Sequence, residues 1–272
     1  MNEVAVQVAG SATAPEDQGV PFGHFKNVQM VFERNRQEPL VAIEDISFDL
    51  EAGNLISLLG PSGCGKTTFL RIAAGLTKAS DGIVRIRGRD VTEPQDDFGF
   101  VFQSPNLMPW RSIIDNVLFP MEVKRRRNAA AKHRALELLD LVGLSGFEKV
   151  RPAELSGGMQ QRAALCRALI HEPSLLLMDE PFGALDELTR MEMNDLLLEI
   201  RNVTGATTLF VTHSISEAIY LSDRVVVFSK RPSRIADLLE IDLAYPRTAE
   251  FRYMSAFTDY EHRASIALGV SR

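Results

Sequence analysis

The most chemically suggestive stretch of the sequence is the glycine-rich run GPSGCGKTT at residues 60–68. It matches the pattern G-x-x-x-x-G-K-[ST], in which glycines let the backbone wrap a phosphate so that successive N–H groups point inward. The lysine of such a loop brings a positive charge to the β- and γ-phosphates of ATP, and the next hydroxyl can bind Mg²⁺. The residues predicted to hold the phosphates are Gly60, Pro61, Ser62, Gly63, Cys64, Gly65, Lys66, Thr67 and Thr68.

The sequence on either side of this run supports the prediction. NLISLLG at 54–60 is continuously apolar, which is typical of a strand buried on both faces. FLRIAAGL at 69–76 has a helical pattern, and a helix that starts after the loop presents its N-terminus to an anion. The alternative, a glycine-rich turn that fits the pattern by chance, is disfavoured by this context.

Two adjacent carboxylates end a second apolar strand, SLLLMDE at 174–180. Asp179 would face the Mg²⁺ through water, and Glu180 is placed to orient or deprotonate an attacking water. The alternative for this pair is an acidic helix start, because Asp and Glu favour the first turn of a helix. Together with the phosphate loop, the pair favours the catalytic interpretation.

Strands and helices alternate along much of the chain. Apolar runs at 207–213 and 224–229 predict two more buried strands, and helical patterns lie before about 202 and from Ser214 onward. This alternation predicts an α/β fold with a parallel sheet covered by helices on both faces. The alternating runs at 26–32 and 44–50 instead predict antiparallel strands.

Other segments differ from this pattern. Apolar residues at helical spacing, followed by Gly143, predict a helical subdomain inserted into the core. The first residues are rich in Ala, Gly and Pro and predict a flexible arm. The predicted divisions are an N-terminal arm at 1–23, an ATPase core at 24–103 and 156–242, the helical subdomain at 104–155 and a C-terminal tail at 243–272.

A further motif connects these features. Residues 155–162 read LSGGMQQR, which resembles the signature sequence of ATP-binding-cassette (ABC) ATPases. The order of motifs is also similar: the phosphate loop, Gln103 after FGFVF, the signature, Asp179–Glu180, ALD at 184–186, and then a histidine. The resemblance covers about 25–242. It implies a P-loop NTPase core with an antiparallel β subdomain and an inserted α-helical subdomain.

The resemblance implies catalytic roles for matching residues. Glu180 resembles the catalytic base, and His213 resembles the residue that holds the γ-phosphate. Gln103 resembles the residue that contacts Mg²⁺ and the attacking water while joining the core to the helical subdomain. The predicted Mg²⁺ ligands are therefore Thr67, Gln103 and Asp179.

The resemblance also implies a dimer. Ser156, Gly157 and Gly158 are similar to the signature residues that contact ATP held by an opposite subunit, and Asp186 resembles the residue that links the two sites. Ser156 is a good N-cap, and the two glycines leave a helix start bare, which suits an anion. The alternative for these residues is a simple helix-starting turn.

The aromatic residue that stacks on adenine follows the first strand in this family. Phe32 is the candidate here, and Phe25 is its rival. A core or edge-strand phenylalanine is the alternative for Phe32. Cys64 lies inside the phosphate loop, where modification of its thiol would block ATP binding.

Finer segments resemble one class of the family. NLMPW at 106–110, DEPFGALDELTR at 179–190 and the stretch 211–235 are similar to ATPases of nitrate, sulfonate and taurine importers. This class implies a peripheral subunit at the cytoplasmic face of the inner membrane. Its implied partners are a second ATPase subunit, integral membrane permease subunits and, indirectly, an external solute-binding protein. The alternatives are an ABC ATPase of a lipid or export system and a soluble ATP-driven switch.

Composition excludes several other classes. The 272 residues carry 30 Lys and Arg against 36 Asp and Glu, a net charge of −6, so no nucleic-acid partner is expected. The two cysteines rule out a disulfide scaffold. The sequence contains no apolar run of the roughly 18 residues needed to span a bilayer. Its N-terminus lacks the pattern of a secretory signal.

Overall fold

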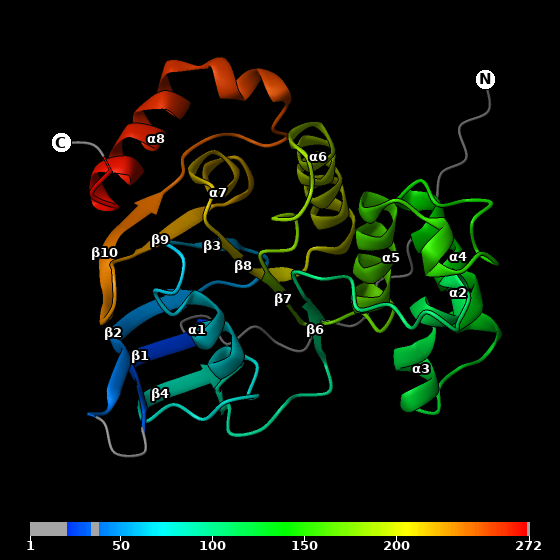
Figure 1. Cartoon of the computed structure of the whole chain (residues 1–272), viewed down its shortest axis with the longest axis horizontal. Helices are drawn as coiled ribbons and strands as arrows, with labels where there is room; N and C mark the ends of the chain where they lie inside the picture. The colour runs from blue at the N-terminus through cyan, green and yellow to red at the C-terminus, as the bar shows by residue number, and fades with distance from the viewer. Residues whose placement is uncertain (1–20, 34–37, 271–272) are drawn as a thin grey trace.

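A computed structural model describes residues 21–33 and 38–270 of the chain, so the predicted N-terminal arm lies almost entirely outside the described residues. Within these ranges ten strands form one sheet (Figure 1). The strands are β1 (Gly23–Phe32), β2 (Leu40–Leu50), β3 (Leu55–Leu59), β4 (Asp81–Ile86), β5 (Arg89–Asp90), β6 (Phe98–Val101), β7 (Leu175–Asp179), β8 (Thr207–Thr212), β9 (Arg224–Phe228) and β10 (Ser233–Glu240).

Eight α-helices and two short 3₁₀ helices complete the described segments. The α-helices are α1 (Lys66–Ala73), α2 (Ile113–Val117), α3 (Phe119–Val123), α4 (Ala129–Leu141), α5 (Gly157–Leu169), α6 (Glu187–Thr204), α7 (Ile215–Leu221) and α8 (Ser255–Ala267). The 3₁₀ helices are η1 (Pro152–Glu154) and η2 (Ala249–Tyr253). No helix in the described part of the chain is both long and apolar enough to cross a bilayer.

The strand order is β5-β4-β1-β2-β10-β9-β3-β8-β7-β6. Strands β9, β3, β8, β7 and β6 are parallel neighbours, and β1 pairs antiparallel with both β2 and β4. The predicted α/β fold, with a parallel sheet and an antiparallel β part, is therefore confirmed. Strand β10 runs antiparallel to β9 and parallel to β2, so it joins the two parts.

Side chains of the parallel strands alternate between two apolar cores. In β3, Leu55 and Leu59 lie in the core shared with helices α4 to α8, whereas Ile56 and Leu58 lie in the core shared with α1. Helices α6 and α7 accordingly lie on one side of these strands and α1 on the other (Figure 1). Burial on both faces explains why these strands have continuously apolar sequences.

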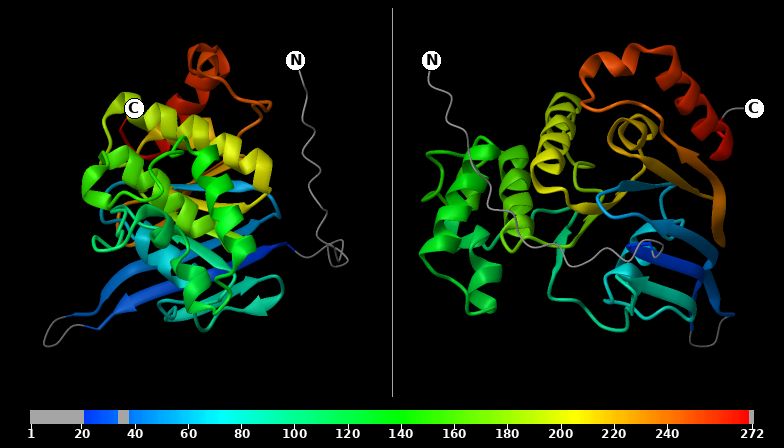
Figure 2. Two further views of the ribbon diagram at one scale, coloured as in Figure 1. Left: turned by 90° about the vertical axis from the view of Figure 1, so that its right-hand side faces the viewer. Right: turned by 180° about the vertical axis from the view of Figure 1, so that it is seen from behind.

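The segment between β6 and β7 is helical, as its spacing predicts. Helix α5 packs against α2, α3, α4 and the edge strand β6. Helices α2 to α5 gather at one end of the molecule, away from β1, β2 and β4 (Figure 2). The boundaries at 103 and 156 stay predictions, because α5 contacts both the helices and the sheet.

The C-terminal tail packs on the core through α8 and η2. Phe257 and Ala264 are buried at its contact with α7 and β10. Arg247, only 6% exposed, donates hydrogen bonds to the carbonyls of Ile219, Tyr220 and Ser222 at the end of α7. These bonds satisfy carbonyl groups that a helix C-terminus leaves without partners.

An aromatic cluster fixes α1 to the sheet directly behind the phosphate loop. The ring of Phe69, fully buried, lies 5.1 Å from that of Phe25, 5.5 Å from Phe48 and 5.9 Å from Phe228. Phe25 is thus a core residue, which argues against it as the adenine-stacking aromatic. The cluster connects the helix that follows the loop to β1, β2 and β9.

We predict that Phe69→Ala lowers the free energy of unfolding by about 3–5 kcal/mol, because it removes a buried ring and leaves a cavity. Urea unfolding followed by circular dichroism measures this change. Leu76→Ala, at a side chain that is 52% exposed, is the control and should change stability by less than about 0.5 kcal/mol. Equal effects of the two substitutions would contradict the proposed anchoring.

Candidate active site

The predicted phosphate loop connects β3 to α1. Two of its glycines have left-handed backbone angles, with φ of 75° at Gly63 and 117° at Gly65. A Cβ at Gly65 would also lie 3.3 Å from the carbonyl oxygen of Ala42 and from Ser233 Oγ. A side chain at this position is therefore disfavoured twice, by conformation and by space.

Lys66 points its amine back into the loop. The side chain is only 4% exposed, and its Nζ donates to the carbonyl oxygens of Gly60 at 2.7 Å and Pro61 at 3.1 Å. The same Nζ lies 3.8 Å from Glu180 Oε1. A buried ammonium group held by carbonyls and one carboxylate is a positive charge kept ready for an anion.

Thr67 is joined to the first predicted carboxylate. Its Oγ1 donates a 2.8 Å hydrogen bond to Asp179 Oδ1, across 112 residues of sequence. Burial raises the pKa of Asp179, and the negative charge of Glu180 raises it further, while the Thr67 bond opposes the rise. The predicted Mg²⁺ ligands Thr67 and Asp179 thus lie side by side.

Glu180 and His213 also face each other. Glu180 Oε2 lies 3.0 Å from His213 Nδ1, at hydrogen-bond distance. The backbone of Glu180 has a φ of 44°, which is uncommon for a residue with a side chain, and its N–H donates to Val211 O at 3.0 Å. That bond to β8 holds the turn in which Glu180 leaves β7. The structure therefore brings together Lys66, Thr67, Asp179, Glu180 and His213.

Gln103, the third predicted Mg²⁺ ligand, follows strand β6. It is exposed, two residues beyond the end of β6, and the described residues show no hydrogen bond between it and the other predicted ligands. The neighbouring Phe102 carbonyl accepts a 3.1 Å hydrogen bond from Gln161 Nε2, whose side chain is 2% exposed. Gln161 of the signature helix α5 thus fixes the start of the Gln103 segment.

The signature residues lie beside the Asp186 turn. Ser156 caps α5 by accepting a hydrogen bond from Met159 N, and Asp186 caps α6 by accepting one from Thr189 N. A Cβ at Gly158 would lie 2.7 Å from Thr189 Cγ2, so glycine allows the two helix starts to approach. Across residues 21–33 and 38–270, no hydrogen bond or ion pair joins Ser156 or Asp186 to the phosphate loop.

Two further predicted residues differ in their surroundings. Phe32 ends β1 and is 39% exposed, which leaves its ring free to stack on a flat ligand. Cys64 is only 2% exposed, and burial raises the pKa of its thiol. Modification of Cys64, which is predicted to block ATP binding, is therefore disfavoured while the loop keeps this conformation.

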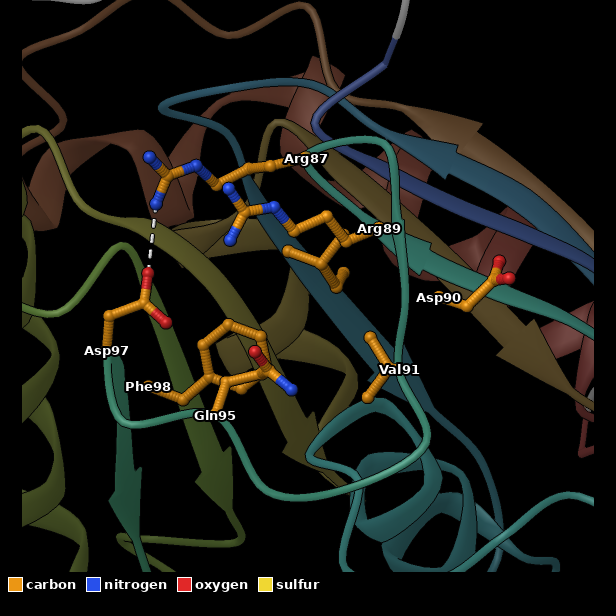
Figure 3. Close-up of a pocket in the computed structure, with 8 residues that line it drawn as sticks. Arg87, Arg89, Asp90, Val91, Gln95, Asp97 and Phe98 are labelled. Atoms are coloured by element: carbon orange, nitrogen blue, oxygen red, sulfur yellow. Dashed lines mark hydrogen bonds and ion pairs between the residues drawn. The ribbon is translucent and has the colours of Figure 1, made fainter.

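A separate hollow of about 210 Å³ lies beside β4, β5 and β6 (Figure 3). Its lining includes Arg87, Arg89 and Gln95, and Arg87 donates a 2.9 Å hydrogen bond to Asp97. The hollow shares no residue with the phosphate loop or with the cluster around Glu180. The chemistry of the predicted site thus lies elsewhere, at the ends of the parallel strands.

Comparison with known proteins identifies the family. The profile of the ABC transporter family matches residues 43–183, which include the phosphate loop, the signature and Glu180. The chain belongs to the ABC transporter family. This ABC ATPase therefore binds and hydrolyses ATP, and the predicted enzyme class is confirmed.

Curated relatives of this ABC ATPase have closely similar sequences. It is 45% identical over 222 residues to an uncharacterised ABC transporter ATP-binding protein of Methanocaldococcus jannaschii, covering 82% of this chain and 83% of the relative. It is 45% identical to the aliphatic sulfonates import ATP-binding protein SsuB of Bacillus thuringiensis subsp. konkukian, covering 75% and 80%. It is 43% identical to the taurine import ATP-binding protein TauB of Pelagibacter ubique, covering 77% and 79%.

Solved structures of ABC cassettes share the fold. A dimeric cassette in a post-hydrolysis state, bound to ADP and Pi, matches with a TM-score of 0.70 and 31% identity, over 82% of this chain and all of that one. A second dimeric cassette matches with a TM-score of 0.71 and 32% identity. The predicted P-loop NTPase core is thereby confirmed.

The sequence interpretation missed residues that support the site. In the sequence, Gln161 stands out only as one residue of the signature motif, with no role of its own. Glu217 follows Ser214 by three residues, a spacing typical of a capping box. In the structure Thr212 Oγ1, and not the N–H of Ser214, donates to Glu217, so that spacing could have indicated Glu217 but not its partner.

We predict that both thiols of the folded chain react slowly with Ellman's reagent at pH 8. Cys64 and Cys166 are buried, and burial raises both pKa values, so less reactive thiolate is present than in a free cysteine. Reaction should be at least about tenfold slower than in guanidinium chloride, where both thiols are accessible. Rapid modification of Cys64 in the folded chain would show that the loop opens readily.

Proposed function

We propose that this ATPase powers the import of a small anionic organic solute, of the sulfonate or taurine kind, through separate membrane subunits. The observation that carries the proposal is the similarity, over about three quarters of the chain, to relatives named as sulfonate and taurine import ATP-binding proteins. The cluster at the ends of β3, β7 and β8 supplies the groups that ATP hydrolysis needs.

In the proposed mechanism the loop holds the phosphates of ATP. Backbone N–H groups of the loop and of the start of α1 would bind the anion, and Lys66 would exchange its carbonyl partners for phosphate oxygens. Catalysis then consists of positioning and charge neutralisation around the γ-phosphate. The exposed ring of Phe32 is the proposed adenine platform.

The Thr67–Asp179 pair is suited to Mg²⁺. A hydroxyl and a carboxylate are hard oxygen ligands of the kind that Mg²⁺ prefers, and burial keeps them in place. Bound there, Mg²⁺ would neutralise charge on the phosphates. Gln103, which is exposed two residues after β6, is the third proposed ligand.

Glu180 is the proposed general base. Its carboxylate lies between Lys66 at 3.8 Å and His213 at 3.0 Å, so two neighbours fix its position. It orients the attacking water and accepts its proton. His213 is half exposed and is proposed to hold the γ-phosphate while it orients Glu180.

The second half of each site is proposed to come from another copy of the chain. Ser156, Gly157 and Asp186 are exposed, and they lie together where two helices start. We propose that Ser156, Gly157 and Gly158 contact ATP bound to the opposite copy, and that Asp186 links the two sites. The dimeric cassettes with the same fold support this arrangement.

The membrane subunits are proposed to dock between β6 and the helical region. A hollow of about 490 Å³ lies there, lined by apolar side chains that include Phe100, Phe102 and Val123. Trp110, which is 71% exposed, lies between β6 and α2 in the sequence. We propose that the docked ATPase lies at the cytoplasmic face of the inner membrane, and that an external solute-binding protein delivers the solute.

We predict that Glu180→Gln leaves ATP binding intact and lowers turnover by about two orders of magnitude, because an amide cannot accept the proton of the water. Phosphate release and calorimetric binding of ATP measure the two quantities. Glu199→Gln, at an exposed position of α6, is the matched control. Near-normal hydrolysis by Glu180→Gln would remove Glu180 as the base.

A second variant separates binding from chemistry. Lys66→Ala removes the buried positive charge and should greatly weaken ATP binding in the calorimeter. The two variants therefore differ in which quantity they change. Unchanged ATP affinity in Lys66→Ala would contradict the proposed phosphate loop.

We predict that the tagged chain, purified from detergent-solubilised native membranes, carries a multi-span membrane protein at stoichiometric yield. Val123→Asp should reduce this yield, because it places a charge in the apolar hollow at a side chain that is 65% exposed. Val203→Asp, 61% exposed on α6, is the control. Recovery with ribosomes, DNA or soluble proteins alone would overturn the transport function while leaving the ATPase.

A further inference from the structure

Two buried polar atoms near the active site have no hydrogen-bond partner among the described residues. They are Oε1 of Glu217 on α7 and Nε of Arg190 on α6. The side chain of Glu217 is only 6% exposed, so water outside the protein cannot satisfy it. A buried acceptor and a buried donor without hydrogen-bond partners destabilise the folded state, unless a hydrogen-bonded link joins them.

Both residues line the same small hollow. It measures about 10 Å³, close to the smallest volume that holds one ordered water, and Glu180 and His213 also line it. Arg190 comes from α6 and Glu217 from α7, two helices that pack against each other. Burial raises the pKa of Glu217, and the positive charge of Arg190 opposes this rise, so the two groups lie within electrostatic reach.

The other oxygen of Glu217 controls the turn that carries His213. Glu217 Oε2 accepts a hydrogen bond from Thr212 Oγ1, and the same hydroxyl accepts one from Ser214 N at 3.0 Å. His213 lies between these two residues in the chain. The backbone on both sides of the histidine is therefore fixed through Glu217.

Arg190 controls the turn that carries Asp186. Its Nη2 donates to Leu185 O at 2.9 Å, and its backbone N–H donates to Asp186 O at 2.9 Å. Its Nη1 also pairs with Glu187 at 3.3 Å. Arg190 lines the hollow and its Nε has no hydrogen-bond partner among the described residues, so Nε is available for a bond toward α7.

We propose that Arg190 Nε and Glu217 Oε1 are bridged by one water molecule in this hollow, and that the bridge ties the Asp186 turn to the His213 turn. Arg190 and Glu217 are then positioning residues, which act on the γ-phosphate through His213. This inference rests on the proposed role of His213. It adds a route within one chain by which a contact at Asp186 affects hydrolysis.

The test compares variants of the full-length chain for ATP hydrolysis. Arg190→Met and Glu217→Met should each lower kcat about tenfold with KM for ATP changed less than about twofold, because positioning is lost but the phosphate loop is intact. Glu217→Gln should keep most of the rate, since an amide can bond both Thr212 and the water. Glu199→Gln on the exposed face of α6 is the control.

Two combinations decide whether the residues act as proposed. The double variant Arg190→Met/Glu217→Met should lose no more rate than the more affected single variant, because both break one bridge. In a His213→Ala background, Arg190→Met should have no further effect. Multiplied losses in the double variant, or an undiminished effect of Arg190→Met without His213, would overturn the proposal.

Three further results separate failure of the proposed water bridge from failure of a variant to fold and from failure of the proposed role of His213. Thermal melting identifies a variant that fails to fold, and Arg190→Met, at a side chain 24% exposed, keeps the test available if Glu217→Met unfolds. Arg252 also faces Glu217 and has unpartnered nitrogens, so coupling of Glu217 to Arg252 instead of Arg190 would refute the bridge. Full activity of His213→Ala would refute the role of His213 itself.

Discussion

The active site depends on one constraint: three parallel strands end at the same level. Leu59 of β3 lies opposite Thr212 of β8, and Asp179 of β7 lies opposite Val211. The residues that follow these strands therefore leave the sheet at a common edge, although the end of β3 is more than a hundred positions in sequence from the ends of β7 and β8. The 2.8 Å hydrogen bond between Thr67 and Asp179 links the start of α1 to the end of β7 at this edge. A shift of one residue in the register of β7 would turn Asp179 to the other face and break the bond.

The charged groups at this edge stabilise one another before ATP arrives. Lys66 is buried, and its amine is held by two carbonyls and by Glu180, which in turn faces His213. Such groups would be costly to bury singly, so each depends on the others for its position. The strained backbone of Glu180 is held by its bond to Val211. In the proposed mechanism, phosphate oxygens would replace the carbonyl partners of Lys66 without rearrangement of the sheet, which is the advantage of a preorganised site.

The sequence predicts the parts of the structure that local patterns determine. Continuous apolar runs identified β3, β7, β8 and β9, and the glycine spacing identified the loop before Lys66. Strand β4 was missed because three of its first residues are exposed, and β10 because charged and apolar residues mix along it. Gln161 and Glu217 were missed for another reason. Their partners, the carbonyl of Phe102 and the hydroxyl of Thr212, are brought near only by tertiary packing or by a turn whose bonds the spacing does not determine.

The position of the signature gives the proposed dimer its physical logic. Ser156 and Asp186 cap neighbouring helices. Because Gly158 has no side chain, Thr189 fits against it and the two helices can approach each other. A second copy that brought ATP to the start of α5 would therefore meet the Asp186 turn in the same contact. That turn is held by Arg190, which shares a hollow with Glu217 and His213. Binding of the ATP that the second copy holds would then be coupled to the orientation of His213 toward the γ-phosphate in this copy. Helices α6 and α7 would carry this coupling without any change in the sheet.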